Sequence, residues 1–235
     1  MLLDSYARSD QKPIIIRTRN EGLSLTLAAL LAEWQFAVLD NPGPRVLLLT
    51  DEEGLSPEEE KRAVILSRSP YEGHRKIAFP IDLETLWSRL ETRFHRPPRN
   101  HLRISLSLPL TVAARDEIRP ATLISLSDCG GRFTYHRELT IGEPLSLQLR
   151  LNEKTLPLQG RVIYCLPGGE LAEKQESEVG ILFAKLAPEV QKTLRNEIIH
   201  RYLLRVQAQI PGWAFQTSLG FFDIPSEVLK RLGHY

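Results

Sequence analysis

The pattern of hydrophobic and polar positions changes part-way along the 235-residue chain. Up to residue 94, short continuous apolar runs alternate with segments in which apolar residues recur at helical spacing. Beyond residue 103, apolar and polar residues mostly alternate one by one, which is typical of strands with one buried face. The change of period predicts two domains of different fold class.

Residues 1–94 are predicted to form a small parallel α/β domain. Continuous apolar runs are typical of strands buried on both faces, and here they are separated by helical patterns. Asn20, Ser56 and Asp82 stand where side chains cap such helices. The predicted strand runs occupy residues 13–16, 46–49, 63–66 and 77–79.

Residues 95–206 are predicted to form a closed six-stranded antiparallel β-barrel with a C-terminal helix. Alternation is clearest at residues 104–112, and turns rich in glycine and proline separate further runs. About six short strands favour closure, because a closed barrel has no exposed edges. The further alternating runs are residues 145–151, 156–164 and 179–183. Residues 207–235, which contain several aromatic side chains, are predicted to be an ordered extension.

The helix predicted to begin at Pro188 carries two apolar stripes, one through Leu194 and Tyr202 and one through Ile199 and Leu203. Two stripes need two partners. The barrel is one of them, and the other is either the N-terminal domain or a second copy of the chain. A homodimer through this helix is therefore one of the two alternatives.

The composition is that of an ordinary globular protein, with 42% hydrophobic residues and a net charge of +1. This balance argues against binding to DNA through a broad basic surface. No apolar run is long enough for a membrane span, and the N-terminus lacks the apolar core of a signal peptide. Two isolated cysteines do not make a disulfide framework. We therefore expect a cytoplasmic protein in which any anion site is local.

A local anion site is suggested by the segment 89–103, which carries five arginines and a single acid, Glu91. Pro97 and Pro98 interrupt it and favour an extended connector between the domains.

Two motifs follow one another at the start of the predicted barrel: Arg99 and Arg103 in an RxxxR arrangement, then Ser125, Ser127 and Gly130 in an SxSxxG arrangement. The pair resembles the signature of the PilZ domain, which is RxxxR followed by [D/N]xSxxG. The resemblance covers residues 96–206. It implies a six-stranded barrel that binds cyclic di-GMP as a ligand, without using it as a catalytic cofactor.

The resemblance also implies roles for these side chains. Arg99 and Arg103 would grip the ligand, because a planar guanidinium pairs with phosphate or with a guanine edge and stacks on purines. Arg96 is a further candidate for a phosphate contact. Ser127 would offer a hydroxyl, and Gly130 would let the backbone approach the ligand.

One position departs from the signature, since Ser125 stands where Asp or Asn is expected. Loss of that acceptor would weaken binding about tenfold or more, unless Ser125 or Asp128 compensates. The motifs thus predict a bacterial cyclic di-GMP effector that couples nucleotide binding to domain arrangement and to an unknown protein partner, which would bind through the N-terminal domain. Its output would be motility, adhesion or exopolysaccharide. The alternative is a nucleotide-blind adaptor of the same fold, acting through protein contacts alone.

Residues 13–94 bear a weaker resemblance to a degenerate response-regulator receiver. Thr18 and Arg19 replace the acids that would hold magnesium, although Asp51 lies near the phosphoacceptor position. We therefore expect no phosphotransfer. Phosphate-cradling and nucleophile motifs are absent, and the histidines show no paired ligand spacing. The sequence predicts no enzyme, no catalytic residue and no metal site.

Overall fold

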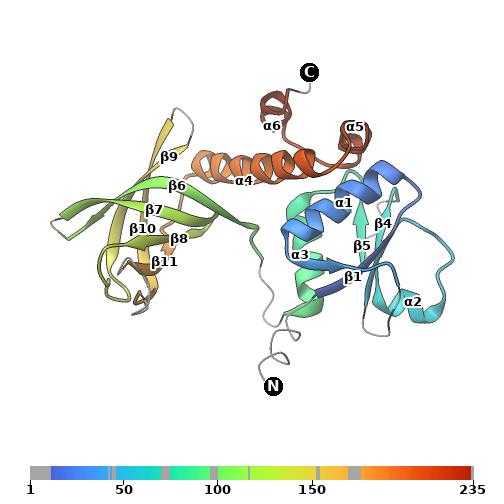
Figure 1. The fold of residues 1–235 in the computed structure, drawn as a ribbon, viewed down its shortest axis with the longest axis horizontal. Helices are drawn as coiled ribbons and strands as arrows, with labels where there is room; N and C mark the ends of the chain where they lie inside the picture. Colours follow the sequence, from blue (N-terminus) through green and yellow to red (C-terminus); the bar gives the residue numbers. More distant parts are fainter. Residues whose placement is uncertain are drawn as a thin grey trace. The chain divides into compact units, whose positions relative to one another are not determined.

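The computed structural model describes residues 12–41, 43, 46–69, 75–95, 100–115, 117–151, 154–168 and 176–233. The chain clusters into two compact units, one formed by residues 1–100 together with 199–235 and one by residues 101–198. Figure 1 shows the elements of both. The domain ranges 1–94, 95–206 and 207–235 stay a prediction. The boundary between the two compact units falls elsewhere, between residues 198 and 199, inside the helix Pro188–Gln209.

The N-terminal unit is built on a five-stranded parallel sheet, as the continuous apolar runs predict. The strand order is β2-β1-β3-β4-β5, one of the common orders of doubly wound sheets. A helix connects β1 to β2 and another connects β3 to β4, whereas among the described residues no helix lies between β2 and β3 or between β4 and β5. In chain order the elements are β1 (Lys12–Arg17), α1 (Glu21–Glu33), β2 (Phe36–Val38), β3 (Leu47–Thr50), α2 (Pro57–Arg62), β4 (Ala63–Ser67), β5 (Lys76–Ala78) and α3 (Leu83–Phe94).

The three predicted helix caps are confirmed. The side chain of Asn20 accepts a hydrogen bond from the backbone N–H of Leu23 at 2.8 Å, and Ser56 and Glu59 form a capping box. Asp82 accepts from the N–H of Thr85 at 2.7 Å. These contacts satisfy amides that the first helical turn leaves unpaired.

The C-terminal residues complete the N-terminal unit. Helix α4 (Pro188–Gln209) passes from one unit into the other and is followed by α5 (Gly212–Ser218), the 3-10 turn η1 (Leu219–Phe221) and α6 (Ser226–Arg231). Helix α5 lies beside α1, where Thr26 Oγ1 donates to Ser218 Oγ at 2.7 Å. Phe222 forms a parallel bridge with Ile81.

The second stripe of α4 is covered within the chain itself. Ile199, Leu203 and Val206 are 4%, 1% and 0% exposed. Arg205 of the same helix donates to the carboxylate of Glu33 at 3.1 Å. The sequence left two partners open for this stripe, and in the structure these residues pack within the N-terminal unit. A homodimer through α4 stays a prediction.

Tyr202, on α4, makes this packing sensitive to alkaline pH. Its ring stands edge-on to Trp34 at 6.1 Å, and burial raises the pKa of its phenol well above the ordinary value. The folded state thus keeps a proton that the unfolded state releases above about pH 10. The contribution of Tyr202 to the free energy of unfolding is therefore fully present below about pH 10 and is lost as pH rises beyond that value.

We expect Tyr202→Phe to abolish this pH dependence. Above about pH 10, the free energy of unfolding of wild type should then fall relative to that of the variant by up to about 1.4 kcal/mol per pH unit. Urea unfolding followed by tryptophan fluorescence measures this, because the three tryptophans, Trp34, Trp87 and Trp213, all belong to this unit. Parallel stability curves for the two proteins would contradict the prediction.

The second unit contains the predicted closed antiparallel barrel, with strand order β10-β11-β8-β7-β6-β9. Inward-facing residues such as Leu110, Phe133 and Val179 are buried, and they fall at alternate positions. The strands are β6 (Arg103–Ala114), β7 (Glu117–Ser127), β8 (Gly130–Tyr135), β9 (Pro144–Leu151), β10 (Lys154–Leu166) and β11 (Ser177–Phe183). Among the described helices, none is long and apolar enough to cross a membrane.

Candidate functional site

The antiparallel register of β6 and β7 brings the two sequence motifs together. Arg103 pairs with Ser127 at the open end of this hairpin, and Ser105 pairs with Ser125. The register shifts between Ser105 and Leu108, where one strand carries extra residues. Arg103, the first residue of β6, is exposed at this end. The first arginine of the RxxxR motif, Arg99, and the neighbouring Arg96 lie outside the described residues.

The two serines of the second motif are buried. Ser125 and Ser127 are each 1% exposed. Ser127 Oγ donates to the carbonyl oxygen of Gly130 at 3.1 Å and lies 3.4 Å from Cys129 Sγ. In this state the Ser127 hydroxyl therefore closes the turn between β7 and β8. Its predicted contact with a ligand remains a prediction, as does that of Ser125.

Gly130 begins β8 at a point where β11 comes very close. A Cβ atom at Gly130 would clash with the carbonyl oxygen of Ile181. The obstacle is backbone, which cannot move aside as a flexible side chain would. The close contact between β8 and β11 therefore requires glycine at position 130. This requirement is separate from the approach of the backbone to a ligand, which the motif implies.

We expect Gly130→Ala to destabilise the barrel by about 1–3 kcal/mol, because the added methyl group has to push β8 and β11 apart. Hydrogen exchange of the β8 and β11 amides measures this, and far-UV circular dichroism follows the melting. Gly212→Ala is the control, since a Cβ there meets nothing within 4 Å. Exchange rates equal to wild type in the Gly130 variant would show that the strands tolerate the methyl group.

Asp128 lies inside the second motif, and the sequence suggested it only as a substitute for the acceptor missing at Ser125. It is 2% exposed, and its Oδ2 accepts from Arg195 at 2.9 Å and from Gln191 at 3.1 Å. Both donors come from the first half of α4, so Asp128 fastens the β7–β8 turn to that helix. Their spacing of four residues places them on one helix face, which is the signal available in the sequence. Oδ2 is thus engaged by α4, and replacement by Asp128 of the acceptor missing at Ser125 stays a prediction.

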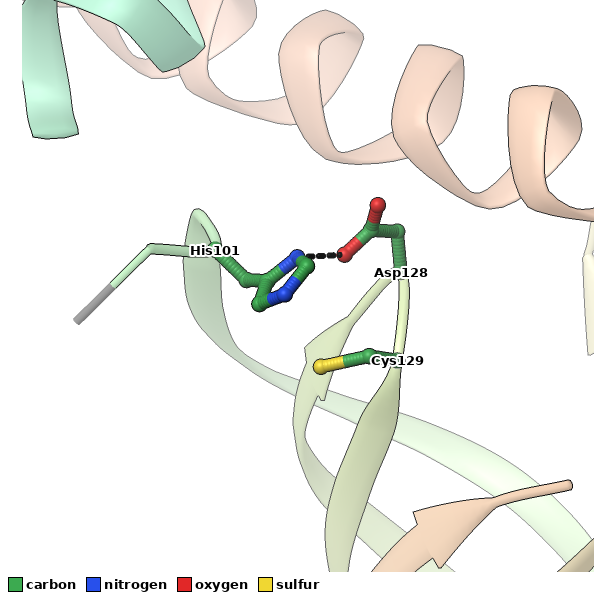
Figure 2. A group of neighbouring side chains, drawn as sticks. All are labelled: His101, Asp128 and Cys129. Carbon is green, nitrogen blue, oxygen red and sulfur yellow. Dashed lines mark ion pairs between the residues drawn. The ribbon is translucent and has the colours of Figure 1, made fainter. Parts of the chain in front are cut away.

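The other carboxylate oxygen of Asp128 faces His101. Figure 2 shows the imidazole of His101 directed at this oxygen, with the thiol of Cys129 nearby. His101 Nδ1 lies 2.8 Å from Asp128 Oδ1, but Oδ1 has no properly aligned hydrogen-bond donor. His101 is half exposed and lies just before β6. The contact is thus an ion pair when the ring is protonated.

The N-terminal unit has a cavity of about 800 Å³ at the carboxyl edge of its sheet. It is lined by charged residues of both signs, including Arg19, Asp51 and Lys76, and by Phe79. The backbone N–H of Arg19 donates to Asp51 Oδ1 at 2.9 Å. Asp51, which lies near the predicted phosphoacceptor position, is therefore held by the backbone of Arg19, one of the two residues that replace the expected acids.

Comparison with known proteins agrees with the motifs of the second unit. The family model described as PilZ domain matches residues 97–200. No curated protein sequence matches the chain.

Solved structures give partial likenesses. The inhibitor of motility MotI/DgrA of Bacillus subtilis is 19% identical, with a TM-score of 0.40, over 45% of this chain and 51% of that chain. The PilZ domain of Escherichia coli YcgR with c-di-GMP is 16% identical, with a TM-score of 0.40, over 47% and 95%. The K. pneumonia MrkH complex with c-di-GMP is 15% identical, with a TM-score of 0.41, over 48% and 55%. This chain thus spans about half the length of two of these proteins.

Proposed function

We propose that the protein is a cyclic di-GMP-binding effector, on the premise that residues 97–200, which match the family model of the PilZ domain, act as such a domain. The observation that carries the proposal is the β6–β7 register, which places Arg103 opposite Ser127 at one end of the barrel. An exposed guanidinium beside a tight turn suits a ligand with two phosphates and two guanines, because the planar fork pairs with either group.

In this proposal Arg99 and Arg96 approach the same ligand from the connector that precedes β6. The two arginines of the RxxxR motif are four residues apart, which lets one act from the connector and the other from the strand. Gly130 and the buried Ser127 hold the turn against which the nucleotide rests, and Ser125 lies behind it. Ligand binding would then require only a local change in the connector and the turn.

We further propose that binding changes the arrangement of the two units. The connector joins α3 to β6, and α4 is the second covalent link between the units. Asp128 ties the turn of the ligand site to Arg195 on α4. A ligand that binds the connector and shifts this turn would act on both links, and an unknown protein partner would respond to the altered arrangement.

The nucleotide-blind adaptor is the second candidate function. It is favoured by the burial of Ser125 and Ser127, whose hydroxyls face away from solvent. In an adaptor the motif residues would serve the turn alone, and Arg103 would take part in surface contacts.

Isothermal titration of the full chain with cyclic di-GMP, at a stated salt concentration, separates the two candidates. The effector predicts saturable binding and a raised melting temperature. Cyclic di-AMP is the matched control ligand, because it keeps both phosphates but lacks the guanine edges, and we expect it to bind much more weakly. Neither heat nor a thermal shift at saturating cyclic di-GMP would reject the effector and leave the adaptor.

A further inference from the structure

We propose that His101, Asp128 and Cys129 form a zinc site at the rim of the barrel. Each offers one ligand atom, and these atoms all lie within 4.8 Å of one another. In the part of the chain that the structure describes, they are the only such group of three or more His, Cys, Asp or Glu side chains. Figure 2 shows them converging from the segment before β6 and from the β7–β8 turn.

The carboxylate of Asp128 has the environment of a metal ligand. Arg195 and Gln191 hold its Oδ2 and so fix its direction, as outer hydrogen-bond partners do in metal sites. Its Oδ1 is buried but lacks a hydrogen-bond donor, an arrangement that costs free energy unless a cation satisfies the oxygen. That oxygen points toward the imidazole of His101.

The set of ligand atoms selects the metal. One imidazole nitrogen, one thiolate sulfur and one carboxylate oxygen suit Zn²⁺, whereas Ca²⁺ and Mg²⁺ prefer oxygen alone. Three protein ligands leave the fourth tetrahedral position for water. The carboxylate and the thiolate together balance the charge of the ion.

The three ligand atoms, which lie within 4.8 Å of one another, have to shift to reach the corners of a tetrahedron. Bonds of about 2.0 Å at tetrahedral angles put neighbouring ligand atoms roughly 3.3 Å apart. His101 Nδ1 and Asp128 Oδ1 are 2.8 Å apart, so the ring has to move outward by a fraction of an ångström. The side chain of His101 is 48% exposed and is free to do so. Zinc then lies between these two groups, and Cys129 loses its thiol proton to solvent when it binds the metal.

The sequence predicted no metal site, because residues 101 and 128 are far apart along the chain and show no ligand spacing. The β6–β7 register brings their neighbours together, since Arg103 pairs with Ser127. The site does not depend on the proposed nucleotide function, because the proposed nucleotide contacts do not include His101, Asp128 or Cys129.

Cobalt(II) added to the reduced, chelator-treated full chain tests the proposal without any nucleotide. We expect one Co²⁺ per chain, with a thiolate-to-cobalt charge-transfer band and the intense visible bands of tetrahedral cobalt, both abolished when Zn²⁺ displaces it. Cys129→Ser should eliminate the charge-transfer band, and Cys129→Ser and His101→Ala should each weaken Zn²⁺ binding by at least about tenfold. Affinity should fall as pH is lowered, because protons compete for the ligands.

Matched controls are Cys165→Ser and His136→Ala. Cys165 is the other cysteine and accepts a hydrogen bond from the Leu139 N–H on another part of the barrel, and the side chain of His136 is 46% exposed. Both variants should bind cobalt as wild type does. Metal-free melting temperatures equal to wild type show that the variants fold. Absence of the band in wild type, its survival in Cys129→Ser, or its loss in Cys165→Ser would overturn the proposal.

Discussion

Replacement of Arg103 by alanine is expected to lower the affinity of the full chain for cyclic di-GMP by about a hundredfold or more. Arg103 is exposed at the start of β6 and stands opposite Ser127 of the second motif. A guanidinium forms two parallel hydrogen bonds with a phosphate or a guanine edge, and each such bond to a charged group contributes about 1.5–3 kcal/mol. Loss of both bonds therefore corresponds to roughly 3 kcal/mol or more, which is over a hundredfold in affinity.

Two further variants test whether the planar guanidinium of Arg103, and not any exposed positive charge, is responsible for the binding. Arg103→Lys keeps the charge without the planar fork, so we expect affinity between those of wild type and Arg103→Ala. Arg150→Ala removes another exposed arginine of the barrel, on β9, which carries neither motif, and should bind as wild type does. Equal titration curves for wild type and Arg103→Ala would remove Arg103 from the site.

Local features of this fold were predictable because their causes are local. Asn20, Ser56 and Asp82 cap helices through bonds that span three residues, and such bonds leave a sequence signature. The alternation at residues 104–112 likewise reports one buried face directly. The three-residue strand β2 was not predicted, whereas the equally short β5 was, because the apolar residues of β2 follow the helical pattern of α1 almost without a break.

Features that depend on distant partners were not predictable. Nothing near residue 128 shows that its carboxylate meets Arg195, because that contact depends on where α4 docks on the barrel. The packing of α5 against α1 joins the two ends of the sequence in the same way. For the site itself, the sequence provided Arg103, Ser125, Ser127 and Gly130 as a motif, but the burial of the two serines follows only from the closed barrel.

A partner far away in the sequence also accounts for the presence of Glu91, the only acid in the arginine-rich segment 89–103. The structure buries it completely on α3, where it pairs with Lys12 of β1. The ammonium of Lys12 lies over the rings of Phe36 and Trp87, at 4.9 and 5.4 Å from their centres. Lys12 is itself 9% exposed, so both charges are removed from water and each depends on the other.

Glu91→Gln is therefore expected to destabilise the N-terminal unit by about 3–5 kcal/mol, because it leaves a buried ammonium without a counter-charge. Urea unfolding followed by tryptophan fluorescence measures this, since all three tryptophans belong to the unit. Glu58→Gln is the matched control, because Glu58 pairs with Lys61 at 2.7 Å while 83% exposed, and its loss should change little.

The double variant Lys12→Met with Glu91→Leu distinguishes an unpaired charge from simple loss of packing. It replaces both members of the pair by apolar side chains of similar size and removes both charges together. We expect it to recover most of the stability that Glu91→Gln loses. If the double variant is as unstable as the single one, the shape of the pair matters more than its charge, and the electrostatic explanation is wrong.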